Sequence, residues 1–172
     1  MNFAAIPLWA KLSGVGVAAL GLLWLVKRTG GHLLPAPPVN PRLSVVQAAL
    51  SQVGSNDSAK YWADVIPGTN MGKASWCGGF ALWALHQAGL ARNWFWQLGK
   101  RFLFQLPMTK SPQPGDIAYF NNYQHHAVVG AIIDPVTVQL INGNGTGGKV
   151  SVSTTPMHSV TAFYSIEPLL HA

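Results

Sequence analysis

The sequence predicts an α+β domain, in which N-terminal helices pack on an antiparallel sheet of about five strands. Apolar residues recur at helical spacing in the first half of the domain. From Gly115 onward, short apolar runs alternate with turn residues, which is the pattern of consecutive strands. Helices followed by a run of strands are typical of this fold class. A separate hydrophobic helix is expected ahead of the domain.

Residues 1–29 are expected to form a transmembrane or signal-anchor helix. Leu12 to Val26 contains no charged residue. At about 1.5 Å per residue this stretch covers roughly 22 Å, short of a hydrocarbon core of about 30 Å. Extension back to Phe3 lengthens the helix but includes Pro7 and Lys11. A cleavable signal peptide and a buried helix of a larger assembly are the alternatives, and charges on both sides leave the topology open.

A semi-rigid linker is expected at residues 30–42, because this stretch contains four prolines and two glycines. The folded domain is then expected at residues 43–172. Charged residues make up only 9% of the whole chain, against about 25% in ordinary soluble proteins. This low charge content favours association with a membrane or a particle.

Two helices are expected early in the domain. Ser44 can cap the first, and Gly54 can end it. The second is the apolar stretch Cys77 to Gly89. Between them, residues 55–75 are expected to be mostly loop with one short helical turn, and the aromatic, basic residues 92–106 are expected to cover the core.

The second half of the domain predicts a sheet. Turn residues separate five runs that have the length and composition of strands. The expected strands are Ile117–Phe120, Ala127–Ile133, Thr137–Asn142, Lys149–Ser153 and Val160–Ile166.

Cys77 is the only cysteine of the chain, and it stands where a loop becomes a helix. The free N–H groups and the dipole of a helix start stabilise a thiolate and lower its pKa. Gly78 and Gly79 leave space beside the sulfur, and the backbone N–H of Cys77 is a candidate oxyanion donor. Cys77 is therefore a candidate nucleophile, and the alternative is a buried structural cysteine.

Histidines adjacent to a predicted strand are the candidates for the base. Of six histidines, His125 and His126 directly precede the apolar run that begins at Ala127. Side chains alternate between the two faces of a strand, so we expect only one of these histidines to meet the thiol. We expect His126 in this role, with His125 as the fallback.

A third polar group should orient the imidazole through its other nitrogen. Asn142 and Asn144 share one face of the following strand and its extension, so either can serve. Both asparagines can instead be turn formers. Asp116 is expected to bond backbone N–H groups at the turn before its strand rather than to take part in catalysis.

These motifs together resemble the NlpC/P60 and CHAP superfamily. The resemblance rests on Trp76-Cys77-Gly78-Gly79-Phe80, on Pro114 to Phe120, on His126-Ala127-Val128-Val129 and on Gly143-Asn144, and it covers roughly Leu43 to Ile166. It is closest to the small CHAP-like proteins of bacteriophages and bacteria. It implies a papain-like α+β fold, with Cys77 as nucleophile, His126 as base and Asn144, or alternatively Asn142, as the third group.

The resemblance also implies an activity, which is the cleavage of peptidoglycan by an endopeptidase or an N-acetylmuramoyl-L-alanine amidase. We expect no metal and no organic cofactor. The expected partners are peptidoglycan and, through the N-terminal helix, a membrane of a bacterium or a phage virion; nucleic acid is not expected. A non-catalytic wall-binding or structural protein on the same fold is the main alternative, and acyl transfer on lipids is a third.

Overall fold

The computed structural model describes residues 40–65, 75–90 and 106–171 of the chain. The predicted membrane anchor at residues 1–29 and nearly all of the predicted linker lie outside these residues. So does the aromatic, basic stretch up to residue 105. Within the described residues, no helix has both the length and the apolar character needed to cross a membrane.

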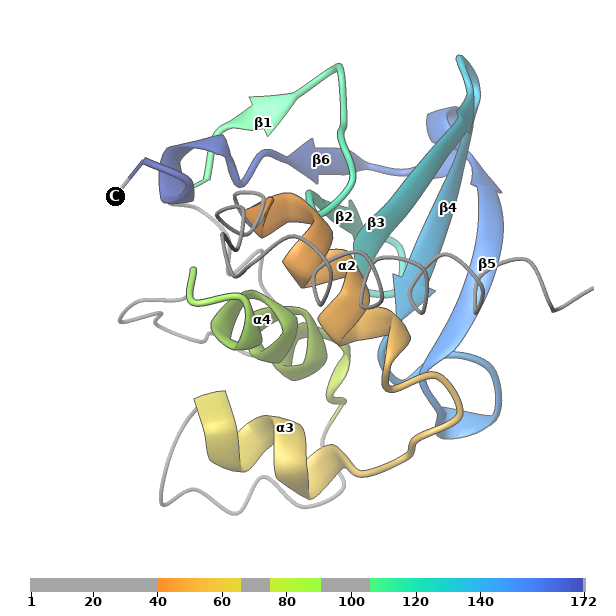
Figure 1. Cartoon of the computed structure of the whole chain (residues 1–172). Helices are drawn as coiled ribbons and strands as arrows, with labels where there is room; N and C mark the ends of the chain where they lie inside the picture. Colours follow the sequence, from red (N-terminus) through yellow and green to blue (C-terminus); the bar gives the residue numbers. More distant parts are fainter. Residues whose placement is uncertain (1–39, 66–74, 91–105, 172) are drawn as a thin grey trace, which may run out of the picture. The chain divides into compact units, whose positions relative to one another are not determined.

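The described residues form a layer of helices and an antiparallel sheet (Figure 1). The helices come first along the chain, and every pair of neighbouring strands is antiparallel, in the order β1-β6-β2-β3-β4-β5. The predicted α+β architecture is therefore confirmed at this level. The elements are α2 (Pro41–Leu50), α3 (Ser58–Val65), α4 (Cys77–Gln87), β1 (Met108–Thr109), β2 (Ile117–Phe120), β3 (His125–Asp134), β4 (Thr137–Asn142), β5 (Ser151–Pro156) and β6 (Ala162–Tyr164).

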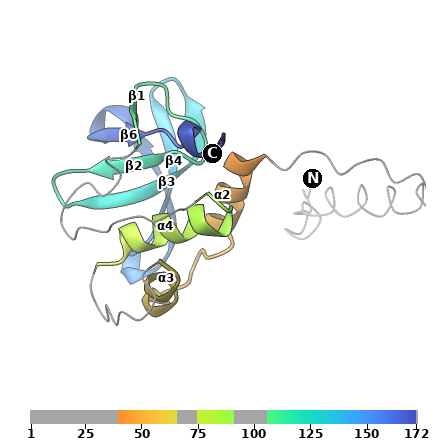
Figure 2. The same cartoon turned by 90° about the vertical axis from the view of Figure 1, so that its left-hand side faces the viewer.

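Helix α4 is the central helix of the domain, because it contacts β3 as well as α2 and α3 (Figure 2). All residues from Cys77 to Leu85 are buried. A helix that is apolar all round can be stable only when other elements surround it. Gly79 allows one of these contacts, since a Cβ at this position would lie 3.2 Å from the indole ring of Trp62 in α3.

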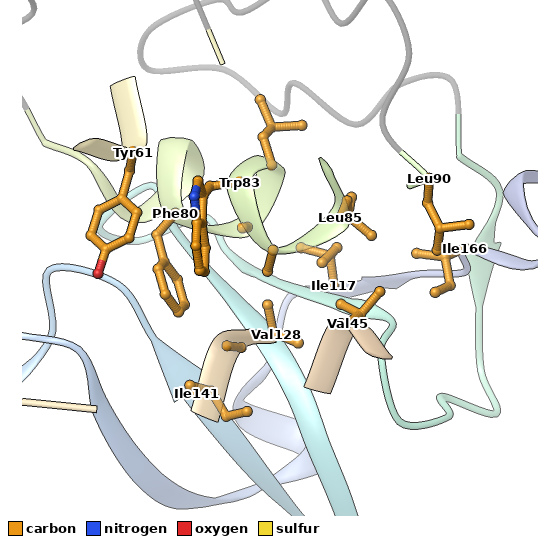
Figure 3. Close-up of a cluster of buried hydrophobic side chains, with 14 of the residues drawn as sticks. Val45, Tyr61, Phe80, Trp83, Leu85, Leu90, Ile117, Val128, Ile141 and Ile166 are labelled. Atoms are coloured by element: carbon orange, nitrogen blue, oxygen red, sulfur yellow. The ribbon is translucent and has the colours of Figure 1, made fainter. Parts of the chain in front are cut away.

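Aromatic and aliphatic side chains fill the space between α4 and the sheet (Figure 3). Tyr61 of α3 packs edge-on against Phe80 and Trp83 of α4, with ring centroids 5.2 and 5.3 Å apart. Trp76, which precedes α4, stacks on Tyr61 at 5.2 Å. This core fixes the position of the first turn of α4, the turn that carries Cys77.

The start of α2 differs from the prediction. Asn40, not Ser44, caps the helix, and its side-chain oxygen accepts a hydrogen bond of 3.0 Å from the N–H of Arg42. Pro41 occupies the first helical position, where its fixed φ and missing N–H cost nothing. The helix therefore begins within the last two residues of the predicted linker.

Asp116 connects three segments that lie far apart in the sequence. Its Oδ1 accepts hydrogen bonds from Nη1 of Arg42 at 2.7 Å and from the backbone N–H of Ile166 at 3.0 Å. Its Oδ2 accepts from the N–H of Gln113 at 2.8 Å. The expectation that Asp116 bonds backbone N–H groups is confirmed. The carboxylate also pairs with Arg42, which the sequence analysis missed.

The strands lie in the predicted order, but several bounds differ. β3 is longer than expected at both ends, β5 runs on to Pro156, and β6 covers only Ala162–Tyr164. β2 and β4 have the expected bounds, but the sheet contains a sixth strand, β1, which pairs with β6. β1 has only two residues, too few for alternation to be visible. β5 begins at Ser151 rather than Lys149, because a short 3-10 turn containing Gly147 and Gly148, both at positive φ, precedes it.

Replacement of Asp116 by asparagine should destabilise the fold. The carboxylate is 1% exposed, and the variant leaves the buried guanidinium of Arg42 without its closest charge partner. Loss of one partner of a buried ion pair costs about 3–5 kcal/mol. We expect a fall of this size in the free energy of unfolding, measured by urea denaturation. Glu167→Gln is the matched control, because Glu167 pairs with the same guanidinium but is 53% exposed, and it should cost far less. Equal losses in both variants would contradict this account.

Candidate active site

Cys77 is the first residue of α4, and its side chain is buried. Burial would raise the pKa of the thiol. Hydrogen bonds and charge from His125 and His126 outweigh burial and lower this pKa from 9.0 to about 5. The sulfur is therefore a thiolate at neutral pH, the form in which cysteine is a nucleophile.

Three polar groups lie within 4 Å of the sulfur. Nδ1 of His126 lies 3.9 Å from Sγ, and the carbonyl oxygen of Gln124 lies at the same distance. The hydroxyl of Ser75, two residues before the cysteine, lies 3.8 Å away. The thiol thus faces the start of β3 on one side and the loop before α4 on the other.

Both histidines lower the pKa of the thiol, and the imidazole that lies within 4 Å of the sulfur is that of His126, the expected base. His126 lies opposite Tyr119 of β2 and follows the strand alternation. His125 is the first residue of β3 and follows Gln124, which has a φ of 53°. Alternation governs residues inside a ladder, and the side chain of a terminal residue is less constrained.

Asn142, the last residue of β4, bonds His125. Its Oδ1 lies 3.0 Å from Nε2 of His125. Its Nδ2 donates to the backbone carbonyls of Leu140 at 3.3 Å and Ser151 at 3.4 Å, and to the hydroxyl of Ser153 at 3.0 Å. A carbonyl only accepts hydrogen bonds, so the amide nitrogen must face these groups. Oδ1 is then the acceptor, and His125 donates from Nε2.

The two asparagines occupy different places. Asn144 lies two residues beyond the end of β4, in a turn where its φ is 53°. Among the described residues, the asparagine that bonds a histidine is Asn142. The structure thus brings Cys77 beside the preferred His126, and it brings the alternative Asn142 onto the fallback His125.

The last residues of β4 pack closely against the first turn of α4. Gly143 directly follows Asn142, and a Cβ at this position would overlap the side chain of Phe80. Phe80 lies one turn after Cys77 in α4. A glycine is therefore required where the strand that carries Asn142 passes the helix that carries the thiol.

The surroundings shift the pKa values of the two imidazoles in opposite directions. Burial would lower the pKa of His125, but its bonds to Cys77 and Asn142 and the charge of the thiolate raise this pKa overall. The pKa of His126 is lowered, because burial outweighs the effect of the thiolate. His125 is therefore the imidazole that holds a proton more readily beside the sulfur.

An aromatic cluster borders His125. Tyr123, which is 63% exposed, stacks on the imidazole with ring centroids 5.6 Å apart and on Phe120 at 5.3 Å. Neither Tyr123 nor Ser153, which bonds Asn142, was among the residues predicted for the site. An aromatic residue two positions before the histidine pair was the available signal for Tyr123, whereas no pattern marked Ser153.

The site has the chemical groups of a cysteine hydrolase. A thiolate at a helix start can attack a carbonyl, and an adjacent imidazole can move the proton. Within the described residues, no three His, Cys, Asp or Glu side chains are grouped so that they could hold a metal ion.

The CHAP domain family matches residues 68–144, a stretch that contains Cys77, both histidines and both asparagines. This match confirms the predicted resemblance to the NlpC/P60–CHAP superfamily. CHAP domains are usually cysteine peptidase or amidase domains, and the match indicates peptidoglycan hydrolase activity in general. Comparison with curated proteins and with solved structures found no match.

The pH dependence of Cys77 alkylation should reveal the lowered pKa. The thiolate fraction rises as pH passes through the pKa, so the rate with iodoacetamide should rise near pH 5 and then level off. An ordinary thiol would keep gaining reactivity up to about pH 8.5. His125→Ala and His126→Ala should each move the rise to higher pH, because each removes a group that stabilises the thiolate. A wild-type profile that still climbs above pH 8 would contradict the described site.

Proposed function

We propose that this protein is a membrane-tethered peptidoglycan hydrolase that cleaves amide bonds through Cys77, His125 and Asn142. The observation that carries the proposal is a thiol whose pKa is lowered by two imidazoles, one of which bonds an amide, within the stretch that matches the CHAP domain. The substrate is a stem or cross-bridge peptide for an endopeptidase, or the muramoyl-alanine bond for an amidase.

The reaction proceeds in two stages. The Cys77 thiolate attacks the amide carbonyl, and the backbone N–H of Cys77 at the start of α4 stabilises the oxyanion. The imidazolium gives its proton to the leaving amine as the C–N bond breaks and a thioester remains. The neutral imidazole then takes a proton from water, whose oxygen attacks the thioester. The acid is released, and the thiolate and imidazolium are restored.

His125 replaces His126 as our choice for the acid–base group. Its Nε2 is engaged with Asn142, which leaves Nδ1 for the thiol proton. Its raised pKa favours the imidazolium that the first stage needs. The buried ring of His126 packs against that of Tyr119, with centroids 4.9 Å apart, and stabilises the thiolate through Nδ1.

A variant series on purified peptidoglycan tests the proposal. Cys77→Ala should abolish hydrolysis, and His125→Ala should reduce it by about 10²–10⁴, the usual contribution of a general acid–base group. His126→Ala should cost less. His86→Ala is the matched control, because His86 bonds Asp64 on the exposed side of α4 and should retain full activity. Mass spectrometry of the fragments identifies the bond that is cleaved.

Three outcomes would contradict parts of this proposal. Hydrolysis that survives Cys77→Ala would exclude the thiol mechanism. A larger loss in His126→Ala than in His125→Ala would restore the original choice of base. Absence of hydrolysis by the wild type across several wall types would favour a non-catalytic wall-binding or structural protein.

The membrane tether is supported by the uncharged stretch Leu12 to Val26 and by the proline-rich residues that follow it. Such a tether would hold the domain next to the wall, on the periplasmic side of a bacterial membrane or in a phage virion. We expect the full chain to remain in the membrane fraction after alkaline carbonate extraction and a chain without residues 1–29 to be released. Release of the full chain would contradict the tether.

A further inference from the structure

We propose that Ser75 is a catalytic residue, whose hydroxyl donates a hydrogen bond to the oxyanion that forms when the Cys77 thiolate attacks a carbonyl. This inference rests on the proposed function, in which the backbone N–H of Cys77 is one donor to that oxyanion. Ser75 is the second donor, and its hydrogen bond comes from a side chain.

Among the described residues, the polar groups near the sulfur differ in what they can donate. The carbonyl oxygen of Gln124 only accepts hydrogen bonds, so it cannot stabilise an oxyanion. Nδ1 of His126 belongs to a buried residue that is 3% exposed. The hydroxyl of Ser75, 3.8 Å from Sγ, is an O–H donor on an exposed residue. Of these groups, Ser75 is therefore the donor that a substrate arriving from solvent can meet.

The distance between Ser75 and the sulfur suits a hydrogen bond to the bound substrate. In the tetrahedral intermediate, the attacked carbon is bonded to Sγ, so the oxyanion lies two bonds from the sulfur. A hydroxyl 3.8 Å from Sγ can reach that oxygen within ordinary hydrogen-bond distance. The thiolate itself does not need this hydroxyl, because His125 and His126 lower the pKa of the thiol.

The start of α4 supplies the backbone donor beside the same sulfur. Trp76, between Ser75 and Cys77, is the N-cap residue, and its side chain has no acceptor and makes no cap hydrogen bond. The carbonyl oxygen of Trp76 accepts from the N–H of Phe80 at 2.9 Å, which closes the first turn. The N–H of Cys77 precedes that bond, at a position without an intrahelical acceptor. Both donors therefore come from the short segment that holds the sulfur.

Two reactions of Cys77 separate a role at the oxyanion from a role at the thiol. In the first, the thiolate attacks the carbonyl of p-nitrophenyl acetate, a C–S bond forms, and an electron pair of the carbonyl moves to oxygen. The oxyanion then collapses, the C–O bond to p-nitrophenolate breaks, and an acetyl thioester remains. In the second, the thiolate displaces iodide from the saturated carbon of iodoacetamide, and no oxyanion forms. The nitrophenolate leaves without a proton, so neither reaction needs an acid.

The variants are Ser75→Ala and the equally shaped pair Ser75→Thr and Ser75→Val in the full chain, with Cys77→Ala as the background. We expect Ser75→Ala and Ser75→Val to be acylated about tenfold to a hundredfold more slowly, the range for a hydrogen bond to a charged group. Ser75→Thr keeps the hydroxyl and should retain most of the rate. The pH profile of alkylation should be the same in all three. On soluble peptidoglycan fragments, the loss should appear in kcat with KM little changed.

A wild-type acylation rate in Ser75→Ala would overturn the inference, and so would an equal loss in Ser75→Thr. A parallel fall in acylation and alkylation would also overturn it, because Ser75 would then act on the thiol or on the fold. If the wild type hydrolyses no wall but its acylation by the ester still depends on the hydroxyl, the proposed function fails and the role of Ser75 stands. A wild type that the ester does not acylate at Cys77 would contradict both.

Discussion

A buried thiolate needs a charge partner, and this requirement organises the whole site. The side chain of Cys77 is only 3% exposed, so the negative sulfur has lost nearly all contact with water. Without such a partner, a buried thiol stays neutral, because the free energy cost of burying its charge is too high. The imidazoles at the start of β3 supply the compensation, and the pKa of the thiol falls to about 5 as a result. The placement of α4 against β3 is therefore a condition for a nucleophile at neutral pH.

The rest of the fold holds α4 and β3 in place. The aromatic core of Tyr61, Trp76 and Phe80 fixes the first turn of α4. Gly143 lets the end of β4 pass close to Phe80, which places Asn142 near the histidines. Asp116 ties the turn before β2 to α2 and to the C-terminal segment. Most of these contacts join residues that are distant in the sequence.

Local patterns predicted much of the fold, because the period of the apolar residues and the turn glycines are local signals. β2 and β4 have the predicted bounds, and Cys77 stands at a helix start as expected. The predicted start of α2 was wrong, because Asn40 and Ser44 both have side chains that can cap a helix. Only Pro41, which follows Asn40, favoured the earlier start. β1 exists only through its pairing with β6, which no local pattern reveals.

The site was predictable in its residue types but not in its contacts. Spacing pointed to a cysteine, a histidine pair and two asparagines. Strand alternation did not indicate that His125 as well as His126 would lower the pKa of the thiol. The choice between Asn142 and Asn144 depended on where the strand ended, and β4 ends at Asn142. Ser153 entered the site only through the register of β5 on β4, which the sequence does not display.

The most direct test of the account is a search for the acyl-enzyme. The full chain would be mixed with peptidoglycan fragments, quenched in acid, digested and analysed by mass spectrometry. The account predicts that the peptide containing Cys77 carries the acyl half of the cleaved substrate as a thioester, and that Asn142→Ala yields less of it. Product formation with unmodified Cys77 at every quench time, and with the Cys77→Ala variant equally active, would contradict the central role of the thiolate.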